Sequence, residues 1–299
     1  MTSISPEDKA EILLQSTPWL KRYSGRVVVI KYGGNAMIDE DLKRAFAEDI
    51  LFLHEWGVKP VVVHGGGPQI NDMLDRLGLK APFEHGLRVT TEDVMEVVRM
   101  VLLGKVQREL VSLLNEDGIS AMGISGEDGG LFQATRKKPV VDGKMVDIGL
   151  VGEITHVNPT SILELLDDNR IPVVSSVAPD EDDPVSVLNV NADLAAGALA
   201  AVIGAEKLIM LTDVEGIYGN YPDKSTIIRQ MSDRDLKEML PDLASGMIPK
   251  AEAAAHALDG GVPQVHIIDG RKPHSMLLEI VTDEGVGTMI TAGHAKVFR

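Results

Sequence analysis

Two apolar runs of the sequence end in glycines, and a lysine closes the first of them. Residues 27–37 read VVVIKYGGNAM, with Lys31 directly after a β-branched run, and residues 60–69 read PVVVHGGGPQ. Glycine lets backbone N–H groups approach an anion without a Cβ atom in the way, and a following helix adds its positive end. Because ligands of open α/β sheets bind at the carboxyl ends of the strands, we predict a phosphate or carboxylate site there. The alternative is that the glycines only form tight turns and that Lys31 reaches solvent.

Three later segments carry polar residues that would suit such a site. In residues 187–205, VLNVNADLAAGALAAVIGA, Asn189 and Asn191 share one face of an extended strand, and Asp193 lies where a helix begins. Residues 208–223 again pass from an apolar strand into a polar loop, TDVEGIY. Lys250 falls in the first turn of a helix, where a bound anion would offset its unfavourable place at the positive helix end. Simpler interpretations are a helix cap at Asp193 and a solvated Lys250.

Several known motifs are absent from the sequence. HGGG also occurs in the oxyanion loop of some esterases, but those enzymes need a G-x-S-x-G turn, which this chain lacks. The patterns G-x-x-x-x-G-K-[ST] and G-x-G-x-x-G, which bind nucleotides and dinucleotides, do not occur either. If this protein uses ATP, it must therefore bind it through another architecture.

The composition narrows the classes of function further. The chain has 299 residues, of which 44% are hydrophobic, and a formal net charge of −16. A nucleic-acid footprint needs a basic surface, so we expect no nucleic-acid partner. The absence of cysteine excludes disulfides and thiolate nucleophiles. No apolar run reaches the roughly 20 residues of a membrane span and the N-terminus lacks signal-peptide features, so we expect a cytoplasmic protein with no membrane partner.

Strand and helix patterns alternate from residue 26 onward, which is typical of parallel βαβ units. We predict strands at residues 27–31, 60–63, 171–178, 207–211, 264–269 and near 288. We predict helices at residues 39–56, 69–77, 91–115, 192–204, 233–240 and 249–258. Residues 136–157 break this rhythm with short strands and several glycines, which indicates an antiparallel insertion. The expected fold class is α/β, with a mostly parallel open sheet.

An additional helix precedes the first core strand. Ser5 can cap it, Pro6 can occupy its first turn, and Pro18 should break or kink it. This helix either packs on its own domain or serves as an oligomerisation arm. We therefore divide the chain into an N-terminal helix at residues 1–24, a first lobe at residues 25–200 and a second lobe at residues 201–299.

Six segments, in this order and across nearly the whole chain, resemble the amino acid kinase family: IKYGGNAM, VVVHGGGPQI, HGLRVT, NVNAD, LTDVEGIY and GMIPKAEAA. The glycine motifs alone would also fit members that act on aspartate, uridylate or carbamate, whereas HGLRVT with NVNAD resembles the branch that phosphorylates N-acetyl-L-glutamate. The resemblance implies an αβα sandwich, with N-acetyl-L-glutamate in the N-terminal lobe and ATP with Mg²⁺ in the C-terminal lobe. The implied product is N-acetyl-L-glutamyl 5-phosphate, formed in the second step of arginine biosynthesis.

The resemblance also assigns roles to residues. It implies that Lys31 and Lys250 stabilise the transferring phosphoryl group and that Asp193 orients both lysines. The implied substrate-binding residues are Gly66 and Gly67 for the side-chain carboxylate, Arg88 and Asn189 for the α-carboxylate, and the neighbouring Asn191. The implied nucleotide-binding residues are Gly33, Gly34, Asp213, Tyr218 and Met247. No residue is assigned to a metal.

The extra N-terminal helix resembles the hexameric, arginine-inhibited members of the family, and so do residues 265–280 and 282–290. We expect a homohexamer, a trimer of dimers, with L-arginine as an inhibitor bound near Lys207, His266, Glu279 and Gly287. The acidic Glu279 would suit a guanidinium or ammonium group. The alternative is that this segment only closes the C-terminal lobe.

Other functions stay open at this point. The chain could phosphorylate another acceptor, such as aspartate or a nucleoside monophosphate. It could also be a catalytically silent ligand-binding module of the same fold, although the presence of both lysines and Asp193 argues against this. A third possibility is a protein that binds a nitrogen-signalling trimer, and nothing in the sequence decides it.

Overall fold

The computed structural model describes residues 5–84, 87–116, 118, 121–141, 144–281 and 285–293. His85 and Gly86 of the HGLRVT segment lie outside the described residues, as do residues 142–143 of the predicted insertion. Residues 1–4, 282–284 and 294–299 of the predicted terminal units also lie outside them. None of the helices in the described part of the chain has the length and apolar character needed to cross a bilayer.

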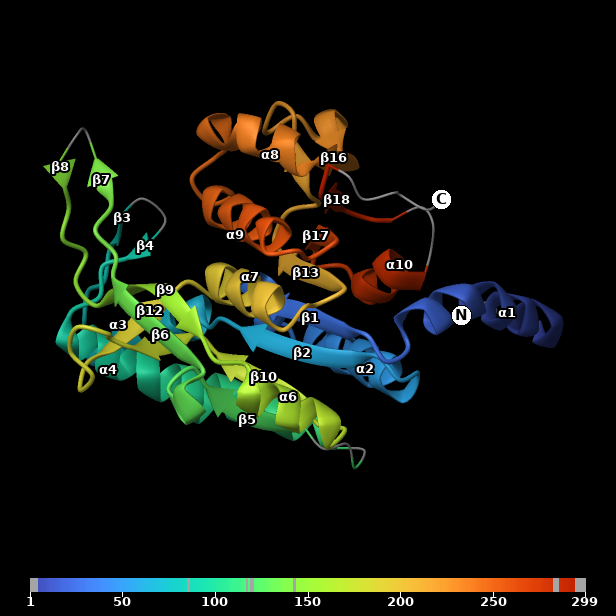
Figure 1. The fold of residues 1–299 in the computed structure, drawn as a ribbon, viewed down its shortest axis with the longest axis horizontal. Coiled ribbons are helices and arrows are strands. Elements are labelled where there is room, and N and C mark those ends of the chain that lie inside the picture. The colour runs from blue at the N-terminus through green and yellow to red at the C-terminus, as the bar shows by residue number, and fades with distance from the viewer. Residues whose placement is uncertain are drawn as a thin grey trace.

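An eight-stranded sheet forms the middle of the molecule (Figure 1). Its strands, in spatial order, are β16 (Gln230–Ser232), β18 (Thr288–Thr291), β17 (Gln264–Asp269), β13 (Lys207–Thr212), β1 (Val27–Tyr32), β2 (Lys59–His64), β10 (Ile171–Ser175) and β5 (Ala121–Ser125). Every neighbouring pair is parallel except β17 with β18. The prediction of a mostly parallel open sheet is therefore confirmed.

Helices cover both faces of this sheet, which gives the predicted αβα sandwich. One face carries α6 (Thr160–Asp167), α7 (Ala192–Val202), α8 (Asp233–Met239) and α9 (Ile248–Asp259). The other face carries α2 (Glu40–Glu55), α3 (Gly67–Leu77), α4 (Glu92–Arg99), α5 (Gln107–Leu114) and α10 (Ser275–Val281). Short 3₁₀ turns occur at η1 (Gly34–Met37), η3 (Asp128–Gly130), η4 (Lys224–Thr226) and η5 (Leu240–Asp242).

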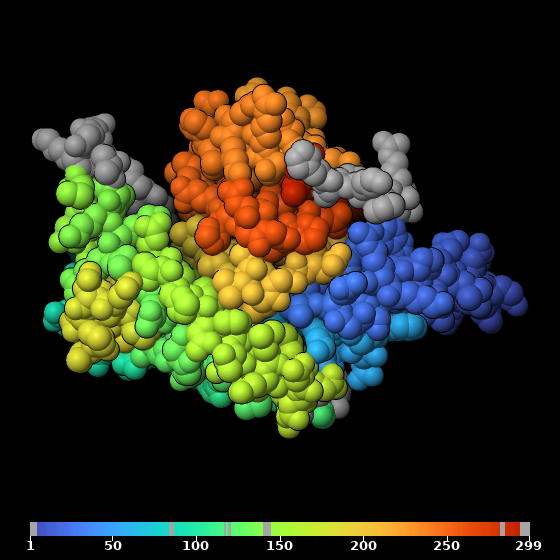
Figure 2. Space-filling model, viewed as in Figure 1, coloured from blue at the N-terminus to red at the C-terminus, as the bar shows by residue number. Residues whose placement is uncertain are grey.

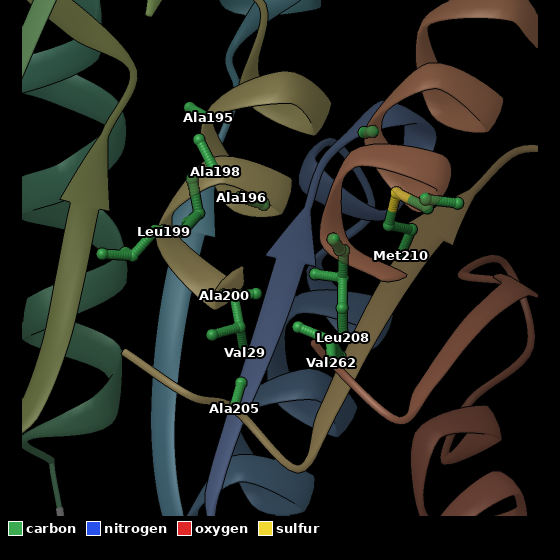
Figure 3. Close-up of a cluster of buried hydrophobic side chains, with 14 of the residues drawn as sticks. Val29, Ala195, Ala196, Ala198, Leu199, Ala200, Ala205, Leu208, Met210 and Val262 are labelled. Carbon is green, nitrogen blue, oxygen red and sulfur yellow. The ribbon is translucent and has the colours of Figure 1, made fainter. Parts of the chain in front are cut away.

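The sheet divides the core into two layers, because successive side chains of a strand point to opposite faces. In β1, Val28 and Ile30 pack on the α2 side, whereas Val29 packs on the α7 side. On that second face the alanines of α7 lie close to Val29 and Leu208 (Figure 3). Lys31 follows Val29 by two residues, so the same alternation directs it toward α7 at the end of the strand.

The long helix predicted at residues 91–115 is present, but it is not uniform. Between α4 and α5 lies a π-helical segment, η2 (Met100–Val106). It brings Leu102 and Val106 so close to Gly66 that a Cβ atom added there would lie 2.7 Å and 3.2 Å from their side chains. The helical period of the sequence does not reveal such a local change of pitch.

A second, four-stranded sheet flanks the first. Its order is β11 (Val177–Pro179), β12 (Val187–Val190), β9 (Val151–Val157) and β6 (Phe132–Arg136). The pair β6 with β9 and the short pair β7 (Val140–Val141) with β8 (Lys144–Met145) confirm the antiparallel part of the predicted insertion. The interpretation as an insertion was incomplete, however, because β9 pairs in parallel with β12 and so joins the Asn189 strand. Two-residue pairs also form between β3 (Phe83–Glu84) and β4 (Leu87–Arg88), and between β14 (Ile217–Tyr218) and β15 (Ile227–Ile228).

The N-terminal helix α1 (Pro6–Tyr23) projects from the body of the molecule (Figures 1 and 2). Ser5 caps it by accepting the Asp8 N–H at 3.0 Å, as predicted. The prediction that Pro18 breaks this helix is wrong, because the helix continues to Tyr23. The Leu14 carbonyl, which Pro18 cannot bond, belongs to a residue that is 72% exposed, so water can hydrate it. The unit boundaries at residues 24 and 200 stay predictions.

Helices α7 and α9 pack closely against each other at a glycine. A Cβ atom added at Gly197 would lie 2.6 Å from the Ala253 carbonyl oxygen, which is too close for any real contact. Backbone cannot move aside as the end of a side chain can, so Gly197 sets the distance between these helices. That distance matters for the site, because α7 carries Asp193 and α9 carries Lys250.

We predict that Gly197→Ala lowers the free energy of unfolding by roughly 1–3 kcal/mol, because overpacking forces α7 and α9 apart. Urea-induced unfolding measures the difference. Gly104→Ala is the matched control, since Gly104 also lies in a helical segment but has open space at its Cβ position. Equal unfolding free energies for wild type and G197A would contradict the assigned role of this glycine.

Candidate active site

Two lysines share one buried carboxylate at the end of β1. Lys31 Nζ lies 3.1 Å from Asp193 Oδ1, and Lys250 Nζ lies 3.1 Å from Asp193 Oδ2. Asp193 is 4% exposed and Lys31 is 7% exposed. The elements β1, α7 and α9 thus bring together the three residues to which the sequence assigns a catalytic role. The role itself stays a prediction.

The start of α7 explains how Asp193 comes to face the lysines. Asn191 caps this helix, because its Oδ1 accepts the N–H groups of Asp193 and Leu194 at 2.9 Å and 3.2 Å. The simpler interpretation, in which Asp193 is the cap, is therefore wrong. Because the cap comes from Asn191, the Asp193 carboxylate is available to both lysines.

The charges of this centre do not cancel. Burial alone would raise the pKa of the Asp193 carboxyl, but the charges of Lys31 and Lys250 and their hydrogen bonds outweigh it, so this pKa lies below its usual range. The carboxylate is therefore ionised and is outnumbered by the two ammonium groups. An excess of positive charge in a largely buried place attracts anions more strongly than it would in water.

A cavity of about 180 Å³ borders the two-lysine centre, with Lys31 and Asp193 in its wall. Its lining includes all the predicted substrate residues, namely Gly66, Gly67, Arg88, Asn189 and Asn191. Its apolar wall consists mainly of Ile70, Phe83, Leu87, Leu102 and Val151. The sequence did not predict this wall, and Leu102 reaches it from the π-helical segment, for which the sequence carries no signal.

The cavity offers unused hydrogen-bond donors. Within the described residues, the N–H groups of Gly66 and Gly67 donate to no protein acceptor. Arg88 is 6% exposed, lies over the Phe83 ring at 4.6 Å from its centre, and reaches the Gly67 carbonyl at 3.4 Å. Asn189 donates to the Thr90 hydroxyl at 3.2 Å. A buried guanidinium whose recorded contacts include no carboxylate is suited to an anionic ligand.

The second glycine pair lies beside Lys31. A Cβ atom added at Gly33 would lie 2.5 Å from Lys31 Nζ, and one added at Gly34 would lie 2.7 Å from the Asp213 carboxylate. Gly34 also has a φ of +75°, which favours glycine. Asp213 accepts the Asn35 N–H at 2.8 Å, so this predicted nucleotide residue holds the glycine loop in place.

The other predicted nucleotide residues lie on separate elements. Tyr218 is on β14, with its ring centroid 5.9 Å from that of Tyr221. Met247 directly precedes α9, in which Lys250 lies. Contact of these residues with a nucleotide stays a prediction. Among the residues that the structure describes, no three His, Asp or Glu side chains gather in a way that could hold a metal ion.

Another buried polar cluster lies at the end of α1 and contains the four residues predicted to bind arginine. Glu279 of α10 lies 2.6 Å from His266 Nδ1 and accepts the Gly287 N–H at 3.2 Å. Lys207 lies 4.9 Å from the centre of the Tyr23 ring, and burial lowers its pKa to about 8. Burial alone would raise the pKa of the Glu279 carboxyl. Its interactions with His266 and with the N–H groups of Val286 and Gly287 outweigh burial, so this pKa lies below its usual range. Arginine binding at this cluster stays a prediction.

Comparison with known proteins agrees with the observed fold. The sequence model of the amino acid kinase family matches residues 26–269. An acetylglutamate kinase of Bifidobacterium adolescentis is 58% identical over 97% of this chain and 91% of its own length. An acetylglutamate kinase of Nocardia farcinica is 58% identical over 98% of this chain and 96% of its own length.

A solved structure shows the same fold. It is N-acetylglutamate synthase from Neisseria gonorrhoeae complexed with coenzyme A and N-acetyl-glutamate, with a TM-score of 0.81 and 24% sequence identity. The match covers 94% of this chain, which spans 63% of the synthase chain. The fold, the family match over most of the chain and the high identity to named kinases together show that this chain belongs to the amino acid kinase family and is a kinase.

Proposed function

We propose that this protein transfers the γ-phosphoryl group of ATP to the side-chain carboxylate of N-acetyl-L-glutamate. The product is N-acetyl-L-glutamyl 5-phosphate, and the reaction is the second step of arginine biosynthesis. The observation that carries the proposal is the pair of lysines on the Asp193 carboxylate, at the edge of a cavity that contains the buried Arg88. The acetylglutamate kinases that are 58% identical support the choice of substrate.

The chemistry of this reaction fits the residues present. A carboxylate nucleophile is already ionised at neutral pH, so the reaction needs no general base. Its obstacle is the repulsion between the carboxylate and the phosphoryl group. Lys31 and Lys250 would reduce this repulsion at the point of transfer, and Asp193 would hold both ammonium groups in position. The free N–H groups of Gly66 and Gly67 would bind the attacking carboxylate.

The remainder of the cavity fits the other end of the substrate. The planar guanidinium of Arg88 can bind the α-carboxylate through two hydrogen bonds, with Asn189 beside it. The apolar Ile70 and Leu102 suit the methyl group of the acetyl moiety, which needs no hydrogen bond. A volume of about 180 Å³ suits a small amino-acid derivative.

ATP would bind on the C-terminal side of the two-lysine centre. Its phosphates would lie against Gly33 and Gly34, and the other parts of the nucleotide would lie near Tyr218 and Met247. Mg²⁺ bound with ATP supplies charge neutralisation on the β- and γ-phosphates. The side chains here fit a metal that is held mainly by the nucleotide. Asp193 is already bound by two lysines, and Asp213 accepts a backbone N–H.

Lys31→Ala and Lys250→Ala should each lower kcat at least about a hundredfold, because each removes a preorganised positive charge worth roughly 3 kcal/mol in the transition state. An ATP-dependent hydroxamate assay, which traps acyl phosphates, measures this with N-acetyl-L-glutamate, glutamate and aspartate in parallel. Lys59→Ala is the control, since Lys59 pairs with Asp167 at the opposite end of β2. Near-normal turnover in either variant would rule out the assigned roles. If product forms with glutamate or aspartate but not with N-acetyl-L-glutamate, the proposed acceptor is wrong.

Arg88→Lys should raise the KM for N-acetyl-L-glutamate roughly 10- to 100-fold, because an ammonium group cannot make the two-point contact of a guanidinium. The KM for ATP should stay unchanged. Steady-state kinetics with each substrate varied in turn separates the two constants. Arg99→Lys is the matched control, since Arg99 is exposed and pairs with Glu127. A parallel rise of both KM values in R88K would contradict the placement of the substrate.

We also propose that L-arginine inhibits the enzyme by binding at the Glu279 cluster, and that α1 joins dimers into a homohexamer. The buried carboxylate of Glu279 would attract a cationic ligand. The helix α1 packs on α10, which carries Glu279, so the arm and the cluster are in contact. Ile12 and Leu14 are 51% and 72% exposed on a projecting helix, and exposed apolar side chains of this kind favour an interface.

Deletion of residues 1–24 should yield dimers that arginine inhibits less strongly, because α1 would no longer link protomers. Light scattering after size exclusion gives the oligomeric state, and the hydroxamate assay gives the inhibition. Since the deletion also removes the buried Tyr23, Leu14→Glu is a second variant that leaves Tyr23 in place and should dissociate the hexamer as well. A truncated protein that stays hexameric and fully inhibited would show that this proposal is wrong.

A further inference from the structure

His64, the last residue of β2, is fully buried and directly precedes the glycines that line the cavity. Its Nδ1 lies 2.9 Å from the Gly65 carbonyl oxygen. Because a carbonyl oxygen only accepts hydrogen bonds, Nδ1 must carry the proton. None of the steps proposed above uses this imidazole, although it lies next to the predicted anion site.

The imidazole ring is neutral. Burial lowers the pKa of His64 to about 4, the hydrogen bond to Gly65 opposes this change, and the charge of Arg108 adds to it. With the proton on Nδ1, the other ring nitrogen, Nε2, is buried and has no hydrogen-bond partner within the described residues. Burial of an unpaired ring nitrogen costs stability, so an apolar side chain would serve packing better than histidine does.

Peptide geometry connects this hydrogen bond to the cavity. In a trans peptide, the carbonyl of one residue and the N–H of the next point in opposite directions. Strand alternation places His64 on the α2 face together with Val62, and Val63 on the α7 face. With the Gly65 carbonyl bound to the His64 ring, the Gly66 N–H points away from that ring.

We propose that His64 is a positioning residue: by holding the Gly65 carbonyl, it keeps the Gly66 N–H directed into the cavity, toward the carboxylate of the substrate. Residues 65–67 are all glycine, so few steric barriers prevent this peptide from rotating. A rotated peptide would present a carbonyl oxygen in place of the N–H and would repel an anion. The inference rests on the proposed function, because it takes the bound group to be the carboxylate of N-acetyl-L-glutamate.

Three substitutions separate the hydrogen bond from packing. His64→Asn places an amide N–H near the position of Nδ1, His64→Gln places it near that of Nε2, and His64→Leu keeps the volume without a donor. H64N should keep the KM for N-acetyl-L-glutamate within about threefold of wild type. H64Q and H64L should raise this KM roughly tenfold or more, because the Gly66 N–H would no longer donate to the charged carboxylate of the substrate. The KM for ATP should stay unchanged. The thermal unfolding of each variant is measured in parallel.

A purely structural role gives a different result, in which the unfolding temperature falls and both KM values rise together in all three variants. Such a result would overturn the proposal. The proposal would also be wrong if H64L kept the wild-type KM for N-acetyl-L-glutamate, or if H64N and H64L had equal KM values for it. His54→Leu is the control, since His54 lies in the last turn of α2, before β2 begins, and its loss should change neither KM. If the wild-type enzyme forms no product with N-acetyl-L-glutamate, the proposed function fails and this inference fails with it.

Discussion

The double ion pair on Asp193 is the contact on which the active centre depends. It joins β1, α7 and α9, which are far apart in the sequence, and a separate structural feature positions each partner. Strand alternation directs Lys31, the Asn191 cap frees the Asp193 carboxylate, and Gly197 sets the distance at which α9 presents Lys250. Without the carboxylate, two ammonium groups would repel each other in a buried place, so their spacing exists only because Asp193 lies between them.

Local patterns decide much of this arrangement, and that part could be predicted from the sequence. Apolar runs that end in glycine mark the strands and the edge of the sheet where an anion can bind, so Lys31 and the Gly66 loop could be located before the fold was known. The place of Lys250 in the first turn of a helix indicates a bound anion, but its role at the phosphoryl group and the role of Arg88 follow only from the resemblance to a family. The structure then places Arg88 in the same cavity as the glycines.

Features that depend on packing between distant segments could not be predicted. The π-helical segment brings Leu102 next to Gly66 of the glycine loop, but its residues have the pattern of an ordinary helix. The parallel pairing of β9 with β12 joins strands that are separated in the sequence by α6, β10 and β11, and no local pattern specifies such a pairing. The continuation of α1 through Pro18 depends on whether water can reach the Leu14 carbonyl, and that is set by the surroundings of the helix.

The apolar wall of the cavity and the two-lysine centre come from different parts of the chain. Ile70 lies on α3, Phe83 on β3, Leu102 on η2 and Val151 on β9, and none of these elements carries a member of the centre. The choice of acceptor and the transfer of the phosphoryl group can therefore change separately during evolution. Substitutions in the wall can admit a differently shaped acid while the charges around Asp193 stay in place. A scaffold divided in this way can give rise to kinases for several small molecules without rebuilding its reaction centre.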